Sequence, residues 1–245
     1  MPKITVGGLD INYKILGKGE PLLLIIGLSF SLLDWGTEFP NLLAEHYQVI
    51  LFDNRDAGET SHAAAAYTLA DIATDAVGLL NALNIPKAHV LGISMGGMIA
   101  QQLALQYPDK LSQLILGCTV AGGSCSQLGS FGDVLNGNLL DFLFPSDFTQ
   151  ANQARLATFF ETTTPYHSRG DALTRQLQAV HSHDTCKVLE QITAPTLVIT
   201  GDSDRVIPSS NSFFLADKIS NAAIKVINNA GHGFCFSHPD TTAIA

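Results

Sequence analysis

The sequence predicts an α/β domain built around a mostly parallel β-sheet. Short apolar segments alternate with segments of helical periodicity between residues 48 and 118, which is the pattern of β-α-β units. A continuous aliphatic run at residues 22–26 is typical of a strand buried on both faces. The 245 residues are 46% hydrophobic and only 14% charged, so the chain can bury a large core.

Charge and the N-terminal segment limit the possible partners. The 22 Asp and Glu residues exceed the 13 Lys and Arg residues, and the net charge of -9 argues against nucleic acid or an anionic membrane surface. No apolar signal region is present, and residues 22–26 are far fewer than the ~20 that span a membrane. We expect a cytoplasmic protein without membrane insertion, and no pattern specifies an oligomeric state.

Cysteine spacing predicts the redox environment. Cys118, Cys125, Cys186 and Cys235 show no C-x-x-C pattern, which argues against a zinc site or a disulfide framework and favours a reducing compartment. We expect each cysteine to be a small apolar core residue.

Residues 3–26 predict a β-meander. Alternating apolar residues at 4–6 and 11–15 are separated by a Gly-Gly turn, and a second turn at 17–21 leads into the aliphatic strand. The second turn lacks the length and the Lys-Ser/Thr ending of a phosphate loop. The following loop, 27–31, lies at the carboxyl end of a central strand, where open parallel sheets bind ligands.

The next elements continue the alternation. Residues 36–46 predict a helix, and residues 48–52 a strand that runs into a polar turn at 53–61. Arg55 stands between two aspartates there, and we expect it to tie down the turn rather than to perform chemistry.

A second helix follows the polar turn. Thr68 and Asp71 form the pattern of a capping box at its start, and Pro86 follows its end. Residues 114–118 predict a further strand.

Residues 88–100 predict a buried strand, a tight turn and a buried helix. Gly92, Ser94 and Gly96 form the spacing G-x-S-x-G, in which the missing side chains let a strained turn pack against both elements. Such a turn would expose the serine hydroxyl and leave the Met95 N–H at a helix N-terminus, where negative charge is favoured. We therefore expect Ser94 to be a nucleophile, a plain glycine-serine turn being the alternative.

Residues 121–190 contain no predicted strand. Helical patterns cover 135–144, 150–162 and 172–189. An all-helical insertion between two strands predicts a lid over the carboxyl edge of the sheet. Its large apolar and aromatic residues are Phe131, Leu135, Leu139, Phe142, Phe144, Phe148, Phe159, Phe160 and Tyr166.

His181, His183 and Asp184 lie close together in the sequence, as metal ligands often do. Residues two apart point to different sides of a helix, and no further cluster of ligand types lies nearby. We expect these residues to be solvated or to pack within the insertion.

The core resumes with strands at 194–200 and 224–227. The loops that follow them carry an acid, Asp202 or Asp204, and His232. The predicted nucleophile, the acid and the histidine thus occur in the order Ser, Asp, His, each after a strand. This order and placement suit a catalytic triad on a parallel sheet.

With these elements the whole chain resembles the α/β-hydrolase superfamily, and within it the small esterase, lactonase and cofactor-free haloperoxidase-like branch. Four landmarks carry the resemblance: the elbow at 92–96, the acid loop at 201–208, the histidine loop at 230–232 and the turn at 53–61.

The resemblance implies a mostly parallel eight-stranded sheet flanked by helices. It implies a hydrolase core of residues 1–120 and 191–245 and a helical lid of residues 121–190. It also places the acid at Asp204, because the acid of the family stands three residues after the glycine of its loop.

Three departures from the family pattern have expected consequences. Ile26 replaces the usual histidine, so a hydrogen bond that braces the next loop is lost. Asp56 replaces a glycine, which would place a carboxylate near the mouth and disfavour anionic substrates. The family usually continues through a closing helix beyond the position of Ala245, so the chain is expected to be shortened.

The predicted activity is hydrolysis of a carboxylic ester or lactone of a small to medium apolar substrate, as in serine carboxylesterases. His232 would act as general base for Ser94, Asp204 would hold the imidazole, and the N–H groups of Leu28 and Met95 would bind the oxyanion before water releases the acyl-enzyme. The mechanism requires no metal and no cofactor.

Other functions use the same residues. Peroxide in place of water would give a perhydrolase or haloperoxidase, and cleavage beside a ketone would give a carbon-carbon bond hydrolase. A ligand-binding receptor on the same fold would bind tightly and turn over slowly. Bromination of a dye would identify a haloperoxidase, and a very low turnover number would identify a receptor. The sequence does not name the acyl or alcohol group of the substrate.

Overall fold

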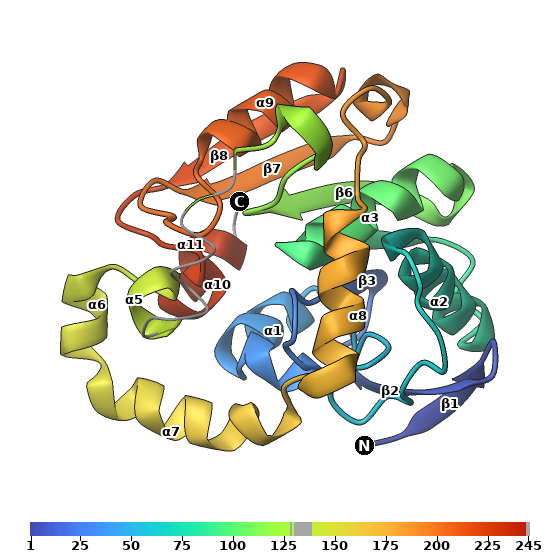
Figure 1. The fold of residues 1–245 in the computed structure, drawn as a ribbon, viewed down its shortest axis with the longest axis horizontal. Helices are drawn as coiled ribbons and strands as arrows, with labels where there is room; N and C mark the ends of the chain where they lie inside the picture. Colours follow the sequence, from blue (N-terminus) through green and yellow to red (C-terminus); the bar gives the residue numbers. More distant parts are fainter. Residues whose placement is uncertain (128, 130–138, 244–245) are drawn as a thin grey trace.

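The centre of the computed structural model, which describes residues 1–127, 129 and 139–243, is one eight-stranded sheet. The strand order is β1-β2-β4-β3-β5-β6-β7-β8 (Figure 1). The pairings β1–β2 and β2–β4 are antiparallel, and all the others are parallel, so the predicted sheet is confirmed. The strands are β1 (Lys3–Val6), β2 (Leu9–Leu16), β3 (Glu20–Ile25), β4 (Tyr47–Phe52), β5 (Ala88–Ile93), β6 (Leu111–Gly117), β7 (Thr196–Gly201) and β8 (Ala222–Ile227).

The meander predicted over residues 3–26 is wrong beyond its first hairpin. β1 pairs with β2, but β4 lies between β2 and β3. β3 has a parallel neighbour on each side, β4 and β5. This central position explains the aliphatic run of β3, because both faces of a central strand are covered. β3 is therefore not the third strand of a meander.

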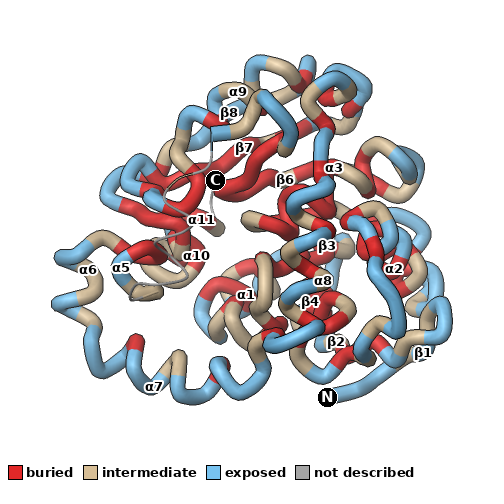
Figure 2. Tube along the Cα trace, in the orientation of Figure 1, coloured by how far each residue is buried: buried red, intermediate tan, exposed pale blue. Residues whose placement is uncertain are grey.

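Helices cover both faces of the sheet. Leu23 and Ile25 of β3 belong to the hydrophobic cluster that includes residues of α2, α3 and α9, whereas Leu22 and Leu24 point to the cluster of α1, α10 and α11. Figure 2 shows the central strands buried and the outer sides of the helices exposed. The bounds are α1 (Glu38–Ala44), α2 (Leu69–Ala82), α3 (Met95–Gln106), α9 (Ser210–Lys218), α10 (Phe234–Ser237) and α11 (Pro239–Ala243).

The capping box predicted for α2 is confirmed. The Thr68 hydroxyl accepts from the Asp71 N–H at 3.3 Å, and the Asp71 carboxylate accepts from the Thr68 N–H at 2.7 Å. Across the described part of the chain, no helix has both the length and the apolar composition needed to cross a membrane.

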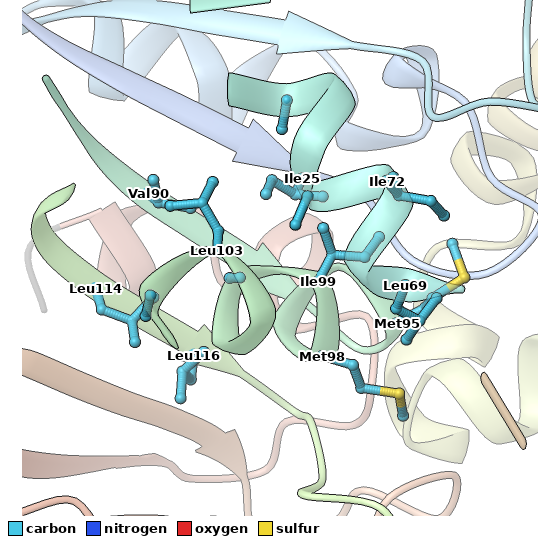
Figure 3. Packing of buried hydrophobic residues seen from close by; sticks show 14 of the residues in the cluster. Ile25, Leu69, Ile72, Val90, Met95, Met98, Ile99, Leu103, Leu114 and Leu116 are labelled. Atoms are coloured by element: carbon cyan, nitrogen blue, oxygen red, sulfur yellow. The ribbon is translucent and has the colours of Figure 1, made fainter. Parts of the chain in front are cut away.

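Helix α3 is packed on several sides, as its sequence predicts. Met98, Ile99 and Leu103 lie between β5, β6 and α2 (Figure 3). Their neighbours in this view are Ile25, Leu69, Ile72, Val90, Leu114 and Leu116. The N-terminus of α3, where Ser94 stands, is therefore fixed relative to the sheet.

The insertion between β6 and β7 is helical. α5 (Leu139–Leu143), α6 (Ser146–Ala151) and α7 (Gln153–Thr163) form an arc, and α8 (Gly170–His181) crosses back in front of the sheet in Figure 1. The helix predicted over 172–189 ends at His181 because the chain then returns to the core, where the Thr185 N–H donates to the Ala121 carbonyl at 2.7 Å. Residues 135–138 of another predicted helix, with Phe131 and Leu135, lie outside the described residues.

A disulfide between Cys125 and Cys186 joins the two ends of the insertion. The expectation that all four cysteines are unpaired core residues is therefore wrong for this pair. Their separation of 61 residues gives no spacing signal, and they meet because Gly122 and Asp184 form a bridge beside them. Cys118 and Cys235 are buried thiols, as expected.

His183 packs where the insertion returns to the core. Its side chain is buried, and its Nδ1 lies 3.4 Å from Gln102 Nε2, whereas its Nε2 has no partner among the described residues. His181 is exposed, and the described part of the chain shows no metal-ligand cluster at these two histidines. Burial lowers the pKa of His183 to about 4.

We predict that the free energy of unfolding falls as the pH is lowered from 6.5 to about 4. In this range the unfolded chain binds a proton at His183 that the folded chain does not bind, so acid favours unfolding. The effect is about 3 kcal/mol. Urea unfolding across this range should show a weaker pH dependence in His183→Gln and an unchanged one in the His181→Gln control. An equal pH dependence in both variants would contradict the prediction.

Candidate active site

Ser94 occupies a strained turn between β5 and α3. Its φ of 55° lies in the left-handed region, which non-glycine residues rarely adopt. A Cβ at Gly92 would overlap the Gly96 carbonyl, and a Cβ at Gly96 would overlap the Ile25 carbonyl. The Ser94 N–H donates to the Gly117 carbonyl at 2.9 Å, which fixes the backbone of the turn. The elbow geometry predicted from the glycine spacing is thus present.

His232 and Asp204 form a buried pair on the loops after β8 and β7. His232 Nδ1 lies 2.8 Å from Asp204 Oδ2. Asp204 Oδ1 accepts from the N–H groups of Val206 and Ile207, both at 2.9 Å. These bonds fix the carboxylate. Asp202, the alternative acid, is exposed, and its carboxylate accepts from the Ser203 hydroxyl at 2.8 Å.

The pair determines the protonation of the imidazole. Burial disfavours the charged ring, but the Asp204 carboxylate outweighs this effect, and the pKa of His232 is raised well above 6.5. The Nδ1–H therefore donates to the carboxylate, and above the raised pKa the neutral ring has its lone pair at Nε2. That nitrogen can accept a proton.

One cavity of about 330 Å³ brings together three of the five predicted site residues. Ser94, His232 and Leu28 line it, and residues of α5, α7 and α8 in the insertion also line it, whereas Asp204 and Met95 do not. The wall is mainly apolar: Ile26, Phe30, Trp35, Ile93, Leu139, Leu143, Phe144, Phe159, Phe160, Leu173, Leu177, Val206 and Phe236.

The loop that carries Leu28 is braced without the histidine that Ile26 replaces. Asn54 Nδ2 donates to the Ile26 carbonyl at 3.1 Å, and the Ser29 N–H donates to Gln176 Oε1 at 2.8 Å. Gln176 is fully buried in α8, and its Nε2 donates to the Arg55 carbonyl at 3.1 Å. A side chain of the insertion therefore holds this loop.

Leu28 lines the cavity, and Met95 follows Ser94 as the first residue of α3. Neither backbone amide donates a hydrogen bond to another residue in the described ranges. At the first position of a helix, an amide has no partner within the helix. Neither predicted oxyanion donor is thus used by a backbone hydrogen bond in the described part of the chain.

The expected open carboxylate of Asp56 is not found. Arg175 of α8 binds it through two nitrogens, at 2.8 and 2.7 Å, and the Asp56 side chain is fully buried. Its charge is compensated, so it does not repel anions at the mouth. Arg55 ties down its turn through Asp75, at 2.6 Å, rather than through its sequence neighbours.

Sequence reasoning missed Gln176, Arg175 and a further polar pair on the cavity wall, Asp34 and His167. Each contacts a partner more than a hundred residues away. No local spacing could have indicated these contacts.

A buried thiol lies beside the histidine loop. Cys118, Asp204 and His232 form the one group of metal-ligand types within the described residues. The Cys118 thiol donates to the His232 carbonyl at 3.6 Å, and burial raises its pKa. A neutral thiol and an already paired imidazole are poor ligands for a metal ion.

Comparisons with known proteins agree with this fold. The family model described as alpha/beta hydrolase fold matches residues 20–239. A protein of Pantoea ananatis named "Putative carbamate hydrolase RutD" is 30% identical, over 94% of this chain and 89% of its own length. The crystal structure of the enol-lactonase from Burkholderia xenovorans LB400 has a TM-score of 0.88 and 23% identity, with 99% and 97% of the two chains covered. The structure of Est816, an N-acyl homoserine lactone degrading enzyme, has a TM-score of 0.84 and 26% identity, with 99% and 98% covered.

We predict that Asp204→Asn lowers the pKa of His232. The carboxylate raises this pKa against the effect of burial, and a neutral amide lacks the charge that favours the imidazolium. NMR titration of the His232 ring protons measures the change. Asp202→Asn, which changes an exposed acid two residues away, is the matched control. Equal titration curves for the wild type and Asp204→Asn would refute the electrostatic coupling.

Proposed function

Because the chain belongs to the α/β-hydrolase fold family, we propose that it is a serine hydrolase that cleaves carboxylic esters or lactones. The observation that carries this proposal is the apolar cavity that both Ser94 and His232 line, with His232 paired to the fixed carboxylate of Asp204. A nucleophile, a base and a group that orients the base are the parts that acyl transfer requires.

In the first step, Ser94 Oγ attacks the acyl carbon and His232 Nε2 takes its proton. Asp204 stabilises the imidazolium that forms, since its carboxylate already accepts from Nδ1. The oxyanion accepts hydrogen bonds from the N–H groups of Leu28 and Met95. His232 then returns the proton to the leaving alkoxide, and an acyl-enzyme remains.

In the second step, water replaces the alcohol. His232 takes a proton from the water, and the hydroxide attacks the acyl carbon of the ester on Ser94. The acid is released when the serine oxygen regains its proton from His232. The strained turn keeps Ser94 in one position through both steps.

Cavity size and chemistry support a small to medium apolar substrate. A volume of about 330 Å³ lies at the lower end of the range of small-molecule sites. The similarity to a lactone-degrading enzyme at 26% identity supports a lactone among the candidates. We also propose that residues 121–190 act as a lid over a core of residues 1–120 and 191–245, because α5, α7 and α8 contribute to the cavity wall.

Carbamates are the second candidate class. Relatives at about 30% identity carry carbamate hydrolase in their names. A carbamate ester offers an acyl carbon to the same nucleophile and the same oxyanion donors. Hydrolysis rates for matched alkyl esters and alkyl carbamates decide between the two classes.

Replacing Ser94 by Ala should reduce kcat for the best ester or lactone by at least about a thousandfold, because no other group forms the acyl-enzyme. The measurement is release of acid from a panel of apolar esters and lactones. Ser203→Ala, which removes an exposed hydroxyl, should keep the wild-type rate. Substantial turnover by Ser94→Ala would show that another group does the chemistry.

Gln176→Met should lower kcat about tenfold with a smaller change in KM. Loss of the bond to the Ser29 N–H loosens the loop that presents the Leu28 amide, and oxyanion binding acts mainly in the transition state. Gln178→Met, at an exposed position of the same helix, is the control. A change in KM alone would argue against a role in positioning the donor.

A further inference from the structure

A second imidazole-carboxylate pair lines the same cavity, and the triad mechanism does not use it. His167 Nε2 lies 2.8 Å from Asp34 Oδ1, and both residues contribute to the cavity wall. Asp34 belongs to a short 3-10 helix after the Leu28 loop, and His167 belongs to the insertion, just before α8. The pair therefore joins the two sides of the cavity.

The hydrogen bonds of Asp34 determine the tautomer of His167. Asp34 Oδ2 accepts from the Ser31 N–H at 2.9 Å and from the Ser31 hydroxyl at 3.0 Å. A carboxylate that accepts throughout requires His167 Nε2 to carry the hydrogen. The other nitrogen, Nδ1, then presents a lone pair, and no residue in the described part of the chain donates to it.

The position of the ring is well defined. Its centroid lies 4.8 Å from that of Phe30, and the His167 N–H donates to the Thr164 carbonyl at 3.2 Å. The side chain is only 11% exposed. The imidazole is held through Nε2 while Nδ1 has no protein partner in the described residues, so a donor on a bound ligand can bind to Nδ1.

We propose that the Asp34–His167 pair is the recognition site for a hydrogen-bond donor, a hydroxyl group, on the substrate. The preferred substrates are then esters or lactones with an apolar body and one hydroxyl group distant from the scissile bond. This inference rests on the proposed function, since it assigns the substrate class of that site. A pair that only joined the insertion to the core would need only the hydrogen bond between His167 Nε2 and Asp34. Recognition of a substrate hydroxyl uses the other nitrogen of the ring, Nδ1.

The test compares methyl hexanoate with methyl hydroxyhexanoates that carry the hydroxyl at carbon 2, 3 or 6, positions from which the substrate does not readily form its own five- or six-membered lactone. In the wild type, kcat/KM for the best hydroxylated ester should exceed that of the plain ester by about three- to tenfold, the worth of one hydrogen bond. His167→Phe should bring this ratio to about one. The same substitution at exposed His181 is the matched control and should leave the ratio unchanged.

Asp34→Asn tests the tautomer directly. With the amide oxygen still accepting from Ser31, the amide nitrogen donates to His167 Nε2, and Nδ1 must carry the hydrogen. This variant should gain a preference for methoxyhexanoate esters, which only accept hydrogen bonds, and the wild type should show none. A purely structural role for the pair would not produce this change of preference.

Two results would overturn the inference: a wild-type ratio of one or less at every hydroxyl position, or an unchanged ratio in His167→Phe. Failure of the proposed function is distinguishable, because it would appear as ester turnover that persists in Ser94→Ala. Calorimetric binding of the plain and hydroxylated methyl esters to Ser94→Ala then tests the recognition site alone. Equal affinities would contradict it.

Discussion

The close approach of β5 and α3 at Ser94 is the constraint on which the rest of the site depends. Glycine is required on both sides of the serine because carbonyl oxygens occupy the space of a side chain. The apolar packing of α3 against β5 and β6 stabilises the left-handed backbone of Ser94. One local arrangement thereby directs the hydroxyl to the cavity and places a helix N-terminus beside it.

The insertion contributes hydrogen bonds that position this site as well as residues of the cavity wall. Arg175 and Gln176, adjacent in α8, bind Asp56 and the Ser29 amide, so one turn of helix holds two loops of the core. The disulfide between Cys125 and Cys186 joins the ends of the insertion. Charge compensation at Asp56 is the physical reason that this carboxylate does not determine substrate charge, contrary to the expectation from sequence.

Much of the fold was predictable because its signals are local. The aliphatic run of β3, the capping box at Thr68 and the glycines around Ser94 each depend on neighbours within a few residues. The position of β4 between β2 and β3 depends on pairing across the sheet, and the disulfide depends on contact between segments that are distant in the sequence. Neither feature has a local sequence signal. Asp34 and His167, 133 residues apart, carry no sequence signal for the same reason.

The central claim is that Ser94 is an activated nucleophile. Intact mass measurement after reaction with a fluorophosphonate tests it without knowledge of the substrate. We expect one adduct on the wild type, none on Ser94→Ala, and slower labelling of Asp204→Asn. No adduct on folded wild-type protein, or an adduct that persists in Ser94→Ala, would contradict it.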